Sequence, residues 1–138
     1  MNLSSLVTNN ITEILVKIIQ FTQIRQEIIS ENINNIDACG FVPKDLEVNR
    51  FSELMNTAVC GHVQSGRLML CDTENIKFGA RGHFEVKPIA DTDAREALGE
   101  SRDGYLELQI QKLLENTLNQ RVAAELLKQM QERSSSLE

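Results

Sequence analysis

Four side chains in the middle of the sequence are of the types that bind zinc: Cys60, His62, Cys71 and His83. Cysteine sulfur and imidazole nitrogen are the usual ligands of a tetrahedral zinc ion. Small zinc folds hold their ligands in two close pairs, about two to four residues apart in each pair. Here only Cys60 and His62 are close, with a single residue between them. The spacing therefore favours an interpretation without metal, in which the cysteines are small buried hydrophobic residues and the histidines face water. A zinc-binding domain is the alternative.

Other motifs with catalytic or ligand-binding potential are incomplete. The segment that starts at Asp91 and Asp93 resembles the beginning of a calcium loop, but Arg102 stands where the closing glutamate belongs. Residues 79–82 lack the length and the lysine of a phosphate-binding loop, and the sequence has no Gly-x-Ser-x-Gly elbow. We therefore predict no catalytic residues, no metal and no cofactor, and a protein that is not an enzyme.

Composition and charge narrow the class of partner. The chain has 138 residues, about one domain in length, with 14 Lys and Arg against 20 Asp and Glu and a formal net charge of −6. Basic residues are not clustered and aromatic residues make up only 4%. Phosphate attraction and base stacking are therefore both weak, which excludes nucleic acid as a partner. The odd number of cysteines does not indicate a disulfide scaffold.

The sequence also carries no pattern for membrane insertion. The first residues have no positive charge, and Glu13 and Lys17 interrupt the apolar stretch that follows. No run approaches the roughly 18 apolar residues that a membrane-spanning helix needs. We expect no cleaved signal peptide and no direct membrane insertion.

The sequence of residues 1–37 predicts a long N-terminal helix. They contain no Gly or Pro, and apolar residues recur alternately three and four apart, with Arg25 filling one position. This is a heptad seam, which predicts packing against other helices. The predicted assembly interface on this helix comprises Val7, Ile11, Ile14, Ile18, Phe21, Ile28 and Asn32.

Residues 103–133 predict a second long helix, which Asp103 and Gly104 introduce and the polar tail 134–138 follows. Its large apolar residues lie four apart, a spacing that drifts round a helix by roughly 40° per step. The apolar row therefore spirals and can meet more than one neighbour. The predicted assembly interface comprises Leu106, Ile110, Leu114, Leu118, Val122, Leu126 and Met130. Leu137 and Glu138 are either native or a cloning remnant.

The central segment, residues 38–102, is different in character. All seven Gly and both Pro lie between residues 40 and 104. We expect an extended stretch at 41–48, a short helix at 51–59, β structure at 67–71 and 83–86, and a mobile loop at 91–102. The predicted fold is mainly α with a small β-rich insert, and the long terminal helices pair as a coiled-coil-like hairpin. Each of these helices should be frayed until another helix covers its apolar side.

Residues 25–41, from Arg25 to Phe41, resemble the N-terminal signature of the bacterial flagellar axial proteins. In that family the first helix ends in Asn-Ile-Ala-Asn, followed by Thr-Pro-Gly and an aromatic residue. The match is specific at Asn32, Ile33, Asn35, Gly40 and Phe41, whereas Ala38-Cys39 stands in place of Thr-Pro. Within the family, the short length and the leucine-rich C-terminal helix look most like the proximal rod proteins of the flagellar basal body.

The resemblance implies a structural rod subunit without enzymatic activity. Such a subunit is exported by the flagellar export apparatus without a cleaved signal peptide and is built into the drive shaft that crosses the periplasm. Its implied partners are other copies of itself, neighbouring flagellar rod proteins and the basal adaptor protein that links the rod to the membrane ring. A coiled-coil adaptor unrelated to flagella is a further alternative beside the zinc-binding domain.

Overall fold

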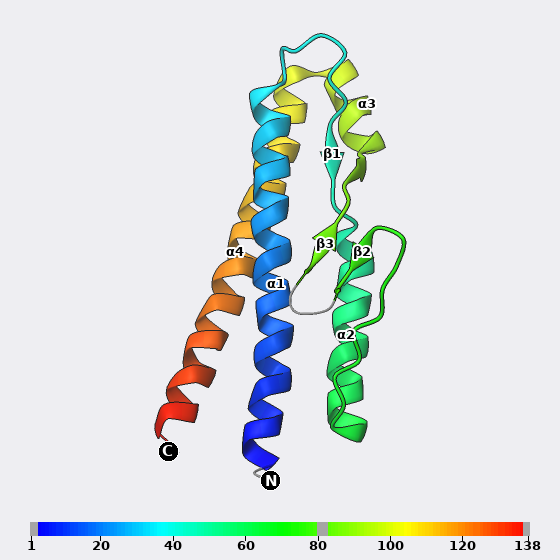
Figure 1. Ribbon diagram of the computed structural model, residues 1–138. Coiled ribbons are helices and arrows are strands. Elements are labelled where there is room, and N and C mark those ends of the chain that lie inside the picture. The colour runs from blue at the N-terminus through cyan, green and yellow to red at the C-terminus, as the bar shows by residue number, and fades with distance from the viewer. Residues whose placement is uncertain (1–2, 80–82, 137–138) are drawn as a thin grey trace.

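The computed structural model describes residues 3–79 and 83–136. Over these ranges the chain is mainly helical, with a small β insert, as predicted (Figure 1). In chain order the elements are α1 (Leu3–Asn34), β1 (Lys44–Asp45), α2 (Val48–Ser65), β2 (Ile76–Lys77), β3 (Glu85–Val86), β4 (Ile89–Ala90), α3 (Thr92–Glu100) and α4 (Arg102–Ser136).

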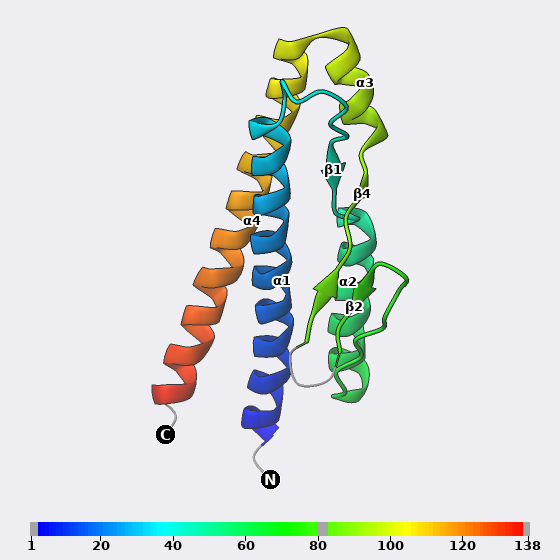
Figure 2. The ribbon, with the colours of Figure 1, turned by 45° about the horizontal axis from the view of Figure 1, so that its top comes forward.

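The two long helices, α1 and α4, lie side by side and antiparallel in both views (Figures 1 and 2). The predicted helical hairpin is therefore present, and each helix has a neighbour within the same chain. The helix ends differ from those predicted: α1 ends at Asn34, before the predicted limit of 37, and α4 runs from Arg102 to Ser136. Residues 134–136 of the predicted tail are helical, because nothing in their sequence stops a helix as Pro or Gly would. Leu137 and Glu138 lie outside the described residues.

The hydrophobic core lies between α1, α2 and the β insert, and not between α1 and α4. Phe21 of α1 stacks on Phe51 of α2, with ring centroids 3.9 Å apart. Ile76 and Phe78 of the insert close the other side of this core. The buried core residues are Ile14, Phe21, Leu46, Phe51, Leu54, Met55, Ala58, Ile76 and Phe78. One part of the apolar side of α1 is thus covered by the central segment, whereas Leu15 and Ile29 are buried outside this core.

The β insert consists of two short antiparallel pairs. Strand β1 pairs with β4, where Lys44 lies opposite Ala90, and β2 pairs with β3, where Ile76 lies opposite Val86. Strands β1 and β3 fall within stretches predicted to be extended, whereas residues 67–71 form no strand and the helix predicted at 51–59 extends over Val48–Ser65. The first pair joins the segment after α1 to the segment before α3.

The prediction of a mobile loop at residues 91–102 is wrong. This segment forms α3, which begins after Asp91 and packs on α4. The Asp91 carboxylate accepts a hydrogen bond from the backbone N–H of Ala94 at 3.1 Å, which caps the helix. Ala94 is fully buried. Its small side chain gives little hydrophobic signal in the sequence, so the charged residues around it suggested a loop.

Candidate functional site

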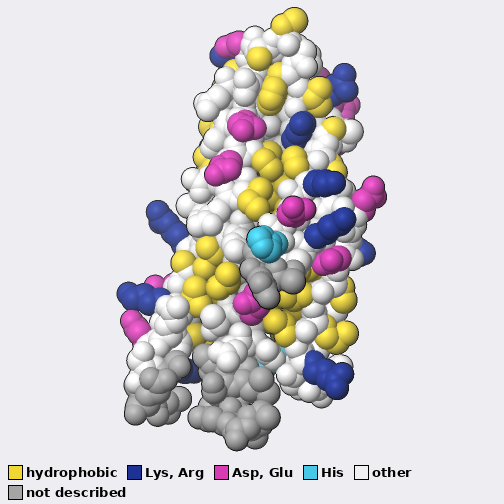
Figure 3. Space-filling model, in the orientation of Figure 1, with side chains coloured by type: hydrophobic (Ala, Val, Ile, Leu, Met, Phe, Trp, Pro, Cys, Tyr) yellow, Lys and Arg dark blue, Asp and Glu magenta, His cyan; other side chains and the backbone are white. Residues whose placement is uncertain are grey.

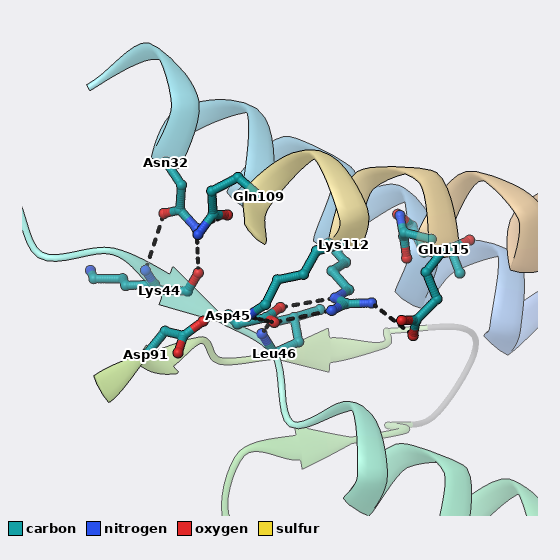
Figure 4. Close-up of polar contacts among 11 residues, drawn as sticks. Asn32, Lys44, Asp45, Leu46, Asp91, Gln109, Lys112 and Glu115 are labelled. Carbon is teal, nitrogen blue, oxygen red and sulfur yellow. Dashed lines mark hydrogen bonds and ion pairs between the residues drawn. The ribbon is translucent and has the colours of Figure 1, made fainter. Parts of the chain in front are cut away.

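A cluster of buried and half-buried polar side chains holds α1, α4 and the β1–β4 pair together. We call it the polar junction and define it as Arg25, Asn32, Asp45, Asp91, Gln109 and Lys112 (Figure 4). Arg25 and Asn32 come from α1, Gln109 and Lys112 from α4, Asp45 from β1, and Asp91 precedes α3. The junction therefore fixes four segments that lie far apart in the sequence.

Asp45 is the centre of the polar junction. Its carboxylate accepts a two-pronged contact from Arg25, Nε to Oδ1 at 2.9 Å and Nη2 to Oδ2 at 3.1 Å. The Lys112 ammonium donates to Oδ2 at 3.0 Å and also bonds to Asp91. The backbone N–H of Leu46 donates to Oδ1 at 2.7 Å. With four donors for two oxygens, this carboxylate is fully satisfied.

Opposite charges within the polar junction stabilise the ionised forms of Asp45 and Lys112. Burial disfavours the ionised form of Asp45, but the hydrogen bonds and positive charges of Arg25 and Lys112 outweigh burial and lower its pKa. Burial likewise disfavours charged Lys112, but Asp91 and Asp45 raise its pKa. For Tyr105, burial and the negative charge of Asp91 both raise the pKa. The cluster therefore combines opposite charges that compensate for each other's burial.

Asn32 connects the end of α1 to β1 and α4. Its side chain pairs with the backbone of Lys44, donating to the carbonyl at 2.7 Å and accepting from the N–H at 3.1 Å. The same amide nitrogen donates to Oε1 of Gln109 at 3.1 Å, and Tyr105 donates its hydroxyl to the carbonyl of Asn32 at 2.7 Å. These bonds fix the orientation of both amides. Gln109 Nε2 is left as a buried donor without a partner among the described residues.

The predicted signature turn lies at the end of α1 and in the segment just after it. Asn35 donates from Nδ2 to the carbonyl of Glu31 at 2.9 Å, at the point where α1 ends. Gly40 has a φ of +73°, a left-handed conformation that favours glycine. Ile33 and Phe41 are half-buried. Asn32 is therefore the signature residue that makes tertiary contacts, and Asn35 and Gly40 shape the turn.

The predicted row on α4 is exposed for most of its length. Leu114 and Leu118 are 65% and 63% exposed. Ile110, Val122 and Leu126 are also exposed, whereas Leu106 and Met130 are half-buried. The α4 residues that are buried on the α1 side are Tyr105, Gln109, Asn116 and Ala123. In the face drawn in Figure 3, a group of hydrophobic side chains reaches the surface over the middle of α4.

An apolar groove runs between α2 and α4, with α1 as its floor. We call it the open groove; its volume is about 510 Å³. Among the described residues that line it, Arg25 is the one that carries a charge, and it lies at the end next to the polar junction. Its apolar lining residues include Ile18, Phe21, Met55, Val59, Val122 and Leu126. This is a surface suited to an uncharged helix.

The predicted row on α1 divides between the core and its margin. Ile14 and Phe21 are buried in the core and Asn32 in the polar junction. Ile11, Ile18 and Ile28 are half-buried. The side chain of Val7 lies outside the described part of the structure. The α1 row is thus largely used inside the molecule.

The four candidate zinc ligands do not form a metal centre. Within residues 3–79 and 83–136, no three His, Cys, Asp or Glu side chains lie together as a metal site would require. His62 instead lies 3.1 Å through Nδ1 from the amide nitrogen of Asn10. The expectation of buried cysteines is wrong: Cys39, Cys60 and Cys71 are all exposed. Each stands on a turn, a helix or a connecting segment at positions that do not face the core.

Sequence reasoning missed Asp45, Gln109, Lys112 and Asn116, which join the elements through polar contacts. Asn116, for example, donates to the backbone carbonyl of Thr22 at 2.7 Å. Hydrophobic periodicity assigns such residues to the solvent side. A signal was nevertheless present, because positions 105, 109, 112 and 116 recur four, three and four apart, the spacing of a helix-packing face.

Comparison of this chain with protein-family models, with curated proteins and with solved structures found no match. In the part of the chain that the structure describes, no helix has the combination of length and apolar character needed to cross a bilayer.

Proposed function

We propose that this protein is a structural subunit of the bacterial flagellar basal-body rod, which assembles through the exposed faces of its terminal helices. The observation that carries the proposal is the exposed apolar row on α4, where Leu114 and Leu118 are 65% and 63% exposed. A contiguous apolar surface of this kind is typical of a protein–protein contact. The open groove beside the row extends that surface onto α2.

The resemblance of residues 25–41 to the axial-protein signature supports the choice of assembly. Asn32 ties the end of α1 to β1 and α4, and Gly40 turns the chain with its positive φ. Together, the contacts of Asn32 and the turn at Gly40 would hold α1 and α4 in a fixed geometry. A fixed helix pair with an exposed apolar side is what a repeating shaft requires of its subunit.

In this role the partners are other copies of the protein, neighbouring rod proteins and the adaptor at the base of the rod. Contacts in a helical assembly join different patches on successive subunits. The exposed row serves this purpose because it winds round α4, so its two ends face different directions. No catalytic step is needed for such a subunit.

The experiment is complementation of a gene deletion in the parent organism with Leu118→Asp. The substitution places a carboxylate at the centre of the exposed row, where it would be desolvated on assembly. We expect loss of the subunit from purified basal bodies and loss of swimming, with normal protein levels. Val63→Asp is the matched control, because Val63 is 75% exposed on α2 and does not line the open groove.

The outcomes are distinct. Normal swimming of the deletion strain would contradict a rod function and favour an adaptor outside the flagellum. Normal incorporation of the Leu118→Asp protein would contradict assembly through the exposed row. Failure of the Val63→Asp protein as well would show that any added charge is damaging, which would remove the support given by Leu118.

A further inference from the structure

A second cavity lies at the end of the open groove that is next to the polar junction. We call it the acidic cleft; its volume is about 610 Å³. Arg25 and Val48 line both cavities, so the cleft continues the groove toward the start of α3. Its lining carries a formal charge of −2, because the five carboxylates of Asp45, Glu47, Asp91, Asp93 and Glu115 face the three cations of Arg25, Arg50 and Lys112.

The three cations are already occupied. Arg25 and Lys112 bind Asp45, and Lys112 also binds Asp91. Arg50 is paired with Glu53, which does not line the cleft. The cations therefore compensate the buried carboxylates of the polar junction and leave the others to solvent.

The surplus negative charge belongs to three carboxylates at the mouth of the acidic cleft. The Glu115 side chain is 60% exposed, and its ion pair is a long contact of 3.8 Å with Arg25 (Figure 4). Asp93 is exposed and Glu47 is half-buried. Neither of these two takes part in an ion pair among the described residues. A cation that enters the cleft would meet carboxylates without a close positive partner.

The open groove selects for a different chemistry. Its floor and walls are apolar, and its exposed rims carry the uncharged side chains of Ser52, Asn56 and Asn119. On α4 the lining runs from Asn116 to Leu126, a length of about 15 Å or three helical turns. A charge placed inside the groove would lose water without gaining a partner. Groove and cleft in line therefore suit an apolar ridge of about three turns that is followed by a positive charge.

We propose that the open groove and the acidic cleft together bind an amphipathic helix of a partner protein, whose apolar ridge ends in Lys or Arg. The ridge occupies the groove, and the basic side chain occupies the cleft beside Glu115 and Asp93. The inference rests on the proposed function in taking this face as an assembly surface, and it names the chemistry of the partner.

The charges of the chain itself favour a different protein over a second copy as the occupant. The exposed apolar ridge of a second copy would be formed by Ile110 and Leu114 on α4. Beside this ridge, Glu107, Glu115 and Arg121 are exposed. With two acids against one base, a second copy brings no surplus of positive charge to the acidic cleft.

The probes are synthetic helical peptides with leucines spaced four and three residues apart over three turns. Two lysines follow the leucines at the C-terminal end of one peptide and precede them at the N-terminal end of a second. Each has a counterpart with glutamates in place of the lysines. We measure binding to the full chain by fluorescence anisotropy. One lysine peptide should bind at least tenfold more tightly than its glutamate counterpart, and added salt should reduce this difference.

Variants of the protein assign the two parts of the site. Glu115→Gln combined with Asp93→Asn should weaken binding of the lysine peptide about tenfold and should not weaken binding of the glutamate peptides. Glu27→Gln is the matched control, because Glu27 is exposed and lines neither cavity. Val122→Asp, within the groove, should weaken every peptide, whereas Val63→Asp should weaken none. Circular dichroism and thermal melting must match the wild type; if the double variant melts early, Glu115→Gln alone should weaken binding about threefold.

Equal binding of lysine and glutamate peptides would overturn the proposal, as would binding of none of them or an equal effect of Glu27→Gln. Self-association of the wild type that Val122→Asp abolishes would also overturn it, because the groove would then hold a second copy. These results can coexist with loss of the Leu118→Asp protein from basal bodies, in which case the rod function stands. Conversely, selective binding of a lysine peptide by a protein whose deletion leaves swimming intact supports the docking site and contradicts the rod function.

Discussion

The polar junction and the open groove both lie where α1, α4 and the central segment meet. They differ in how completely the chain satisfies its own side chains. In the polar junction, the carboxylate of Asp45 has four donors within the same chain. In the open groove, a few turns away, Leu118 remains 63% exposed and Val122 52% exposed. The polar junction is satisfied within the chain, whereas the open groove leaves large apolar side chains facing solvent.

The difference shows which interactions specify the monomer and which are available to a partner. Directional hydrogen bonds and paired charges have stringent geometry, so the polar junction selects a single arrangement of α1, β1 and α4. Apolar contacts are less directional and can be made with a second molecule as well as with the same one. We infer that the polar junction sets the shape of the subunit and that the open groove serves assembly.

Disruption of the polar junction should cause the largest loss of stability. Asp45→Ala removes the hydrogen-bonded partner of Arg25 and one partner of Lys112, both of which are substantially buried. Arg25 then keeps only its 3.8 Å contact with the exposed Glu115 among the ion pairs of the described residues. Removing one member of a buried ion pair costs about 3–5 kcal/mol of folding free energy. Urea unfolding followed by circular dichroism measures this loss. Glu74→Ala, at an exposed carboxylate, should change stability little, and an equal loss in both variants would contradict a special role for Asp45.

The pH dependence of stability should report on the same carboxylate. The pKa of Asp45 in the folded protein lies below its ordinary value of 3.8, so its contribution is present above that value and is lost as the pH falls through the folded pKa. The wild type should therefore lose stability on acidification below about pH 4. In Asp45→Asn this acid-induced loss should be smaller. Parallel pH profiles for the two proteins would count against the junction as its source.

A leucine-to-alanine substitution should lower stability in the core and leave it almost unchanged in the exposed row of α4. Leu54 is 6% exposed in the core and Leu118 is 63% exposed on α4. Leu54→Ala should cost about 2–5 kcal/mol of unfolding free energy, whereas Leu118→Ala should change it by less than about 0.5 kcal/mol. Thermal and urea unfolding of dilute protein give both values. A large loss for Leu118→Ala would mean that α4 is packed on this side within the monomer.

The sequence predicted the long helices, because three-four periodicity over many residues is a strong signal. It assigned the apolar row of α1 to an assembly interface, whereas much of that row is buried within the same chain. Phe21 and Ile14 lie in the core, and even Arg25 and Asn32, at polar positions within that periodicity, are buried. It could not predict that Asp45 meets Arg25, since that pair depends on how the chain returns along α1 after the turn at Gly40. Hydrophobic periodicity alone did not indicate the packed side of α4, because its buried residues, Tyr105, Gln109, Asn116 and Ala123, are polar or small.

Assembly through α4 should shield its exposed apolar row from solvent. In a protein whose exposed Cys39, Cys60 and Cys71 are replaced by Ser, the thiols introduced by Leu118→Cys and by Val63→Cys are labelled separately with a maleimide. We predict that both react rapidly in the dilute protein, and that only the thiol at position 118 becomes protected in the assembled structure. Equal reactivity of the thiol at position 118 in both states, in an assembly that has formed, would contradict the account.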